Sequence, residues 1–176
     1  MTYPETPEPG GHEPPAPGAA KRTDYAGAVY GSLLAASVVA TASVAGELPR
    51  LKLALMLIIT GLVFWAAHVY AHWVGERQLT GTPWSWGEIH RVARHEWSIV
   101  EAAFLPAAAV AVGAVLGLSL SAGAWLALAV AVAQQVAWAC LGAVRASAPR
   151  RQVVAEGAVN LVLGLILMAA KGAVSH

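Results

Sequence analysis

The sequence predicts an all-α fold: a polytopic membrane helix bundle with five transmembrane helices and a short interfacial helix. Composition points this way, because 57% of the 176 residues are hydrophobic and 12% are charged, whereas soluble domains carry about 25% charged residues. Apolar segments recur at about the 20-residue length that an α-helix needs to cross a bilayer. The chain lacks barrel-type alternation, so each segment must pair its backbone groups as a helix.

The N-terminal segment differs from the rest of the chain. Residues 1–23 hold six of the ten prolines and no apolar run of the signal-peptide kind. This composition cannot bury enough apolar surface to offset the entropy of ordering. We therefore expect a disordered, Pro-rich tail over 1–23 and a single transmembrane domain over 24–174.

The five spans are expected at about 24–45, 51–74, 98–118, 123–144 and 152–171. The first is rich in small residues and weakly hydrophobic, and a tight turn over 119–123 joins the third to the fourth. Two GxxxG pairs, Gly27 with Gly31 and Gly113 with Gly117, are typical of close helix contacts within a chain or between copies. Alanine-rich helices also produce such pairs by chance. On the basis of the two GxxxG pairs, we expect a homo-oligomer.

The basic residues predict the orientation. With five spans, eight of the eleven Lys and Arg residues fall on the side of the tail, the 75–97 loop and the 145–151 turn. The positive-inside rule then places the N-terminus in the cytoplasm and the C-terminus outside. We expect a multi-pass protein of a bacterial inner (plasma) membrane. A four-span topology, with the first apolar segment at the surface, is the alternative.

The longest polar stretch between spans predicts an interfacial helix over about 86–97. Ser85 followed by Glu88 is the capping-box pattern of a helix start. Apolar residues then share one side, while Arg91 and His95 lie four apart on another. Because tryptophans accompany this helix, we expect it at the level of the lipid headgroups. A surface for a soluble partner, of unknown identity, is the alternative.

Six polar residues inside the spans are the candidate site residues, since such groups are costly in a membrane and often functional. They are His68, His72, Glu101, Gln134, Glu156 and Asn160. Because they fall in the middle or the cytoplasmic half of their spans, we expect them to face one another inside the bundle. Pro106 is expected to free the carbonyl of Ala102, since proline has no backbone N–H.

Three interpretations of this polar cluster are open. The residues fix helix packing, or they line a water-filled pocket that relays protons or carries an ion or small solute. In the third, His68 and His72 bind a metal with an acid. No HExxH, Gly-x-Ser-x-Gly or P-loop motif occurs, and the lone Cys140 excludes an intrachain disulfide. The net charge of +1 gives no case for nucleic acid.

The expected function is therefore ion, proton or small-solute permeation, with a non-catalytic assembly or scaffold protein as the alternative. Neither an enzyme nor a cofactor or resident metal is expected, and the lipid bilayer is the expected environment. The segments 63–72, 96–103 and 160–171 resemble a group of small bacterial integral membrane proteins without assigned activity. The resemblance extends over most of 25–174. It implies a membrane helix bundle and no mechanism.

Overall fold

The computed structural model describes residues 25–42, 49–80 and 85–174, so the predicted disordered tail lies outside the described residues. Over these ranges the chain forms α-helices and no strand, which confirms the predicted all-α fold. The helices are α1 (Tyr25–Ala42), α2 (Arg50–Thr80), α3 (Trp86–His95), α4 (Ser98–Val115), α5 (Leu120–Arg145) and α6 (Arg150–Val174).

Five segments of the described chain are long and apolar enough to cross a membrane. They are Tyr25–Ala42, Arg50–Gly75, Trp86–Val115, Leu120–Arg145 and Arg150–Ala173, the third of which joins α3 to α4. The protein is thus a multi-pass membrane helix bundle. Its spans agree with the predicted ones apart from the positions at which several helices begin and end.

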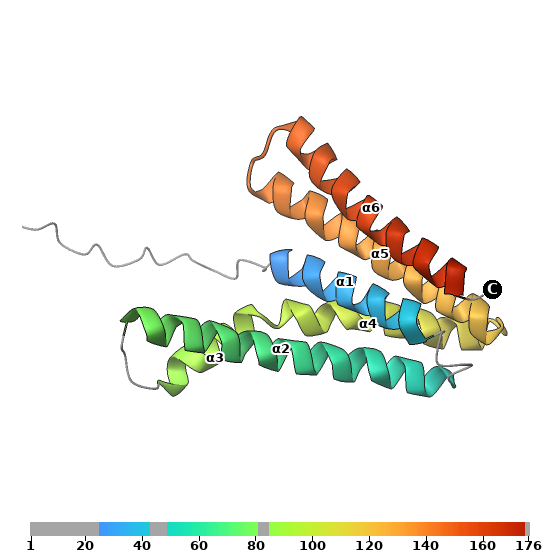
Figure 1. Ribbon diagram of the computed structural model, residues 1–176, viewed down its shortest axis with the longest axis horizontal. Coiled ribbons are helices and arrows are strands. Elements are labelled where there is room, and N and C mark those ends of the chain that lie inside the picture. The colour runs from blue at the N-terminus through green and yellow to red at the C-terminus, as the bar shows by residue number, and fades with distance from the viewer. Residues whose placement is uncertain (1–24, 43–48, 81–84, 175–176) are drawn as a thin grey trace, which may run out of the picture.

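Helix α1 lies in the middle of the bundle and contacts α2, α4, α5 and α6. Figure 1 shows α2 and α4 on one side of it and the α5–α6 pair on the other. Half of the most apolar window of α1 is buried, against 17% for α2 and 11% for α6. The small residues of α1 let other helices approach closely, while the larger side chains of α2 and α6 are left to face lipid.

Helices α1 and α4 approach each other closely at Gly31. A Cβ atom at this position would lie 2.7 Å from the carbonyl oxygen of Ile99 and 2.9 Å from the Cβ of Ala102. For Gly31, the predicted close helix contact is confirmed as one within the chain. On the other side of the bundle, a Cβ at Gly164 of α6 would overlap the Val132 side chain of α5.

The second GxxxG pair shapes the turn between α4 and α5. Gly117 has φ +69°, a left-handed conformation that favours glycine, and the Leu118 N–H donates to the Gly113 carbonyl at 3.0 Å. This is the hydrogen bond of a Schellman helix end. The next helix begins at Leu120, because the Ser119 hydroxyl accepts from the Ala122 N–H at 3.1 Å. The predicted turn over 119–123 is therefore shorter than expected.

Helix α2 is longer than a bilayer requires. Its 31 residues span about 46 Å at 1.5 Å per residue, whereas a hydrocarbon core is about 30 Å thick. About a third of α2 therefore exceeds the length needed to cross the hydrocarbon core. The C-terminal part of α2 extends past α1, and α3 packs beside it (Figure 1). The indole N–H of Trp65 donates to the Ala93 carbonyl at 2.8 Å. The rings of Trp65 and Trp97 meet edge to face with centroids 5.3 Å apart.

The short helix predicted over about 86–97 is present as α3, ending at His95 rather than at 97. Ser85 takes the N-cap position with an extended backbone, but its side chain forms no capping hydrogen bond. The capping-box interpretation is therefore wrong, although it located the start of the helix. Glu88 instead lies 3.5 Å from Arg91, one turn further along the exposed side of α3.

The two ends of the bundle differ in charge. The end at which α1, α4 and α6 begin is called the basic end here, because it carries Arg91, Arg94, Arg145, Arg150 and Arg151. At the opposite end, the Arg50 side chain donates to the carbonyl of Leu118. This contact ties the start of α2 to the α4–α5 turn.

Candidate functional site

Gln134 links three helices in the interior of the bundle. Its side chain is buried, with 8% of its surface exposed. The amide nitrogen donates to the Ser32 hydroxyl of α1 and to the Ala102 carbonyl of α4, both at 3.1 Å. Ser32 in turn donates to the carbonyl of Ala28 at 2.8 Å. One side chain of α5 therefore uses both of its amide protons to bind α1 and α4.

The Ala102 carbonyl needs this partner because of Pro106. In an α-helix the N–H of residue i+4 donates to the carbonyl of residue i, and proline has no N–H. Pro106 is buried inside α4, so Ala102 lacks that donor in a part of the bundle where water is scarce. Gln134 supplies a donor from the neighbouring helix. The freed carbonyl expected from the sequence is thus satisfied by one of the predicted site residues.

Gln135 forms a second polar contact, between α5 and α6. Its side chain is fully buried, and its amide nitrogen donates to the backbone carbonyl of Asn160 at 3.3 Å and to the Asn160 side-chain oxygen at 3.1 Å. Asn160 donates to the Glu156 carbonyl at 2.9 Å. Consecutive residues of a helix point about 100° apart, which is why Gln134 and Gln135 reach different neighbours.

The carboxylate of Glu156 is partly exposed and belongs to this second contact. It accepts a hydrogen bond from the Gln152 side chain at 3.0 Å, one turn earlier on α6. Gln152, Glu156 and Asn160 therefore follow one face of α6, as their spacing of four predicts. Their hydrogen bonds run along α6 and onto α5.

The two histidines lie in a different part of the bundle. The His68 Nδ1 is 3.2 Å from the Phe64 carbonyl of its own helix. The His68 ring packs against Tyr30 of α1 with centroids 4.9 Å apart. His72 lies one turn further along α2 and is exposed. Because α2 and α6 lie on opposite sides of the bundle (Figure 1), the histidines are separated from Glu156 and Asn160.

Glu101 points away from the interior. It is exposed, as are Phe104 and Leu105 on the outer side of α4, while Ala102 and Ala103 face the other helices. The expectation that all six candidates face one another inside the bundle is therefore wrong. Glu101 lies in the first turn of α4, at the end of this helix that is nearer the basic end of the bundle. Its outward position avoids the cost of burying a charge.

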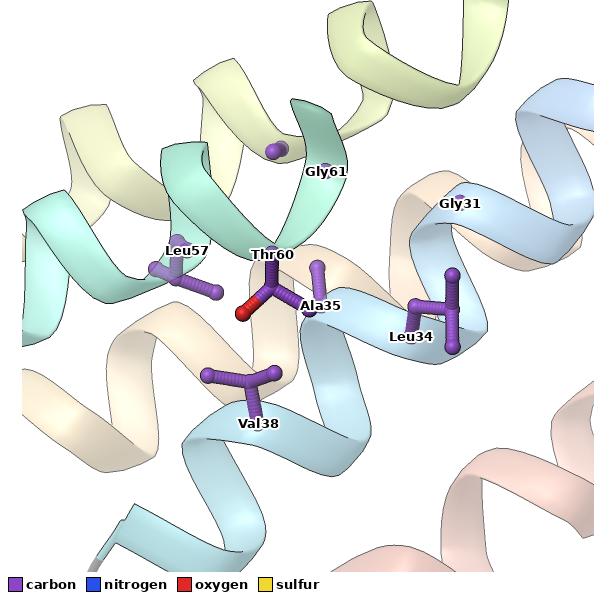
Figure 2. A pocket seen from close by; sticks show the side chains of 8 residues that line it. Gly31, Leu34, Ala35, Val38, Leu57, Thr60 and Gly61 are labelled. Carbon is purple, nitrogen blue, oxygen red and sulfur yellow. The ribbon is translucent and has the colours of Figure 1, made fainter. Parts of the chain in front are cut away.

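A small hollow lies between α1, α2 and α4, away from the polar contacts. Figure 2 shows it from close by, with the Thr60 side chain pointing into it. Its cavity volume is about 10 Å³, and it is lined by Gly31, Leu34, Ala35, Val38, Leu57, Thr60, Gly61 and Ala103. Thr60 supplies the one polar side chain of this lining. None of the six candidate residues lines it.

Comparison with protein families, curated proteins and solved structures found no match for this chain. Its site is therefore interpreted from its own geometry. Among the described residues, no three His, Cys, Asp or Glu side chains come together as a metal site would require. The six candidates divide into the Gln134 contact, the Gln135–Asn160 contact with Glu156, the His68–Tyr30 contact, and the exposed His72 and Glu101.

Four buried polar residues of the described chain were not among the six candidates: Ser32, Ser98, Gln135 and Lys171. Ser32 completes the Gln134 contact. The one feature of the sequence that could have indicated Ser32 is its position next to Gly31 in the first span. Lys171 is 3% exposed near the end of α6, and its Nζ lies 5.4 Å from the centre of the Trp125 ring. The two residues of this cation–π contact are far apart in the sequence, so no local pattern could have indicated it.

Proposed function

We propose that this protein is a non-catalytic membrane assembly or scaffold protein whose internal polar groups specify how its helices pack. The observation that carries the proposal is the pair of hydrogen bonds from Gln134 to Ser32 and to the Ala102 carbonyl. These bonds join three helices at one depth and satisfy a backbone group that Pro106 leaves without a donor.

The energies of such contacts fit a role in packing. Hydrogen bonds between membrane helices contribute about 0.6 kcal/mol on average and up to about 1.7 kcal/mol. This is modest, but the bonds are directional, so they favour one register of α5 against α1, α4 and α6. A fixed register gives the bundle a constant outer surface, which is what an assembly protein presents to its partners.

The arrangement gives less support to permeation of ions, protons or small solutes. A path for these species requires polar groups that follow one another across the membrane. Here Glu101 and His72 are exposed on the outside of the bundle. The hollow between α1, α2 and α4 is lined almost wholly by apolar atoms.

We further infer that the basic end faces the cytoplasm of a bacterium, since eight of the eleven basic residues of the sequence belong to that side. A reporter fused to the C-terminus should then be active outside the cytoplasmic membrane. We also propose that assembly includes further copies of this chain. The mass of the particle extracted in native membrane discs should then exceed that of one chain, and a single-chain mass would argue against self-association.

Flux measurements on reconstituted vesicles test the main proposal. The double variant Glu101→Gln with Glu156→Gln removes both candidate carboxylates, and Glu88→Gln, an exposed acid on α3, is the matched control. We expect proton and potassium fluxes no greater than those of protein-free vesicles, and no change in any variant. Flux well above protein-free vesicles, lost in the double variant while helix content and thermal unfolding stay unchanged, would overturn the scaffold role in favour of permeation.

A further inference from the structure

The surface of α3 that points away from the bundle carries more basic than acidic side chains, with the exposed acid Glu88 lying 3.5 Å from Arg91. Arg94 lies three residues after Arg91 and four after His90, so the three share one side of the helix. All three are exposed, and the Arg91 side chain keeps 67% of its surface accessible. The acid Glu96 is turned inward, with 13% of its side chain exposed. The residues His90, Arg91 and Arg94 are called the basic ridge below.

Contacts with α2 hold the basic ridge at a defined depth. The hydrogen bond from Trp65 to the Ala93 carbonyl fixes α3 beside the sixteenth residue of α2. That residue lies about 22 Å along the helix axis from Arg50. A hydrocarbon core of about 30 Å that begins at the level of Arg50 would end about 8 Å beyond Trp65. The ridge thus lies near the boundary between hydrocarbon and headgroups.

The remaining surface of α3 suits the same location. Trp86 begins the helix and is 75% exposed, and tryptophan is enriched where acyl chains meet headgroups. Val92, on the opposite side, is buried against the rest of the protein. Helix α3 is therefore fixed by its apolar side to the protein and presents its basic and aromatic side outward.

We propose that the basic ridge binds the headgroups of anionic phospholipids. The guanidinium groups of Arg91 and Arg94 match a phosphate in charge and in hydrogen-bond geometry. A basic residue close to an anionic membrane surface favours association by about five-fold. The ridge gives the protein a lipid preference at one side of the bundle. This inference goes beyond the scaffold role, because the ridge could bind lipid whether or not the interior conducts ions.

Quenching by brominated lipid tests the proposal on the full chain. The sole cysteine is removed by Cys140→Ala, and a bimane fluorophore is attached at Gly87→Cys. A Cβ at Gly87 meets no atom closer than the Ser85 Oγ at 3.8 Å, and position 87 lies one turn before Arg91. The labelled protein is placed in phosphatidylcholine vesicles containing a fixed fraction of brominated phosphatidylglycerol or brominated phosphatidylcholine.

We expect brominated phosphatidylglycerol to quench the label more than brominated phosphatidylcholine does. Arg91→Gln with Arg94→Gln should lower this preference at least five-fold. Arg91→Lys with Arg94→Lys should keep much of it, because the charge remains. Arg150→Gln with Arg151→Gln is the matched control at the same end of the bundle and should leave it unchanged. Far-UV circular dichroism checks that each variant folds.

Three results would overturn the proposal. Equal quenching by the two lipids in the parent protein would show that the ridge has no preference for an anionic headgroup. An equal loss of preference in the Arg150 and Arg151 control would assign the effect to the overall charge of the basic end. Quenching by aqueous iodide together with no quenching by either lipid would place α3 in water, where a soluble acidic partner becomes the better explanation of the ridge.

Discussion

Replacing Gln134 by leucine should destabilise the bundle because the Ala102 carbonyl then loses its donor. Leucine has a similar volume, so the change leaves little empty space. The variant loses two interhelical hydrogen bonds, each worth about 0.6 kcal/mol on average in a membrane. An unpaired buried carbonyl adds a penalty of about 1–3 kcal/mol. Together these terms give an expected loss of about 2–4 kcal/mol in the free energy of unfolding.

A double-mutant cycle with Pro106 isolates the physical cause. Alanine at position 106 restores a backbone N–H that can donate to the Ala102 carbonyl inside α4. Gln134→Leu should then cost less in the Pro106→Ala background, with a coupling free energy of about 1 kcal/mol. Gln135→Leu is the matched control, because Gln135 binds Asn160 on α6. Its cost should be the same in both backgrounds.

Reversible unfolding in mixed micelles, titrated with sodium dodecyl sulfate and followed by circular dichroism, measures the four free energies. The reasoning is refuted if Gln134→Leu costs the same with proline or alanine at position 106. It is equally refuted if Gln135→Leu shows the same coupling to position 106. Either result would mean that the Ala102 carbonyl does not depend on the Gln134 amide.

Two further substitutions test the contacts that position the helices. Gly31→Ala should lower the unfolding free energy by about 1–3 kcal/mol, because its Cβ would lie 2.7 Å from the Ile99 carbonyl. Gly123→Ala, with open space around its Cβ, should leave the same micelle titration unchanged. Trp65→Phe removes the hydrogen bond to α3 and should speed amide exchange in that helix about five-fold. Trp138→Phe should not, since the buried Trp138 N–H has no partner among the described residues.

The number and order of the spans could be predicted because each is an apolar segment of the length that a bilayer imposes. The residues at which the helices begin and end were harder to predict from the sequence. The left-handed residue Gly117 ends α4, and Ser119 caps α5, so the turn between them is shorter than composition indicated. Helix α2 continues to Thr80, because polar residues at the end of a membrane helix do not by themselves stop it.

Which residues face the interior could not be predicted in the same way. In water an apolar face points inward, but lipid is as apolar as leucine, so hydrophobicity does not distinguish the inside of a membrane bundle from its outside. For this reason the outward position of Glu101 could not be predicted from the sequence. The sequence did indicate that Pro106 frees a carbonyl. It could not indicate that Gln134, on another helix, reaches it, since that depends on the register of α5 against α4.

The chemical character of the polar groups changes with their depth, and this argues for packing as their role. Deep groups such as Gln134, Gln135 and Asn160 are neutral amides, and each donates a hydrogen bond to another residue. Neutral amides cost far less than charges in an apolar interior once they are paired. The carboxylate of Glu101 lies instead in the first turn of its helix and faces outward. The buried cation Lys171 is near the end of α6, where it lies against the Trp125 ring. A conduction path needs the opposite arrangement, with ionisable groups at the middle depth, so the distribution favours fixed helix register over transport.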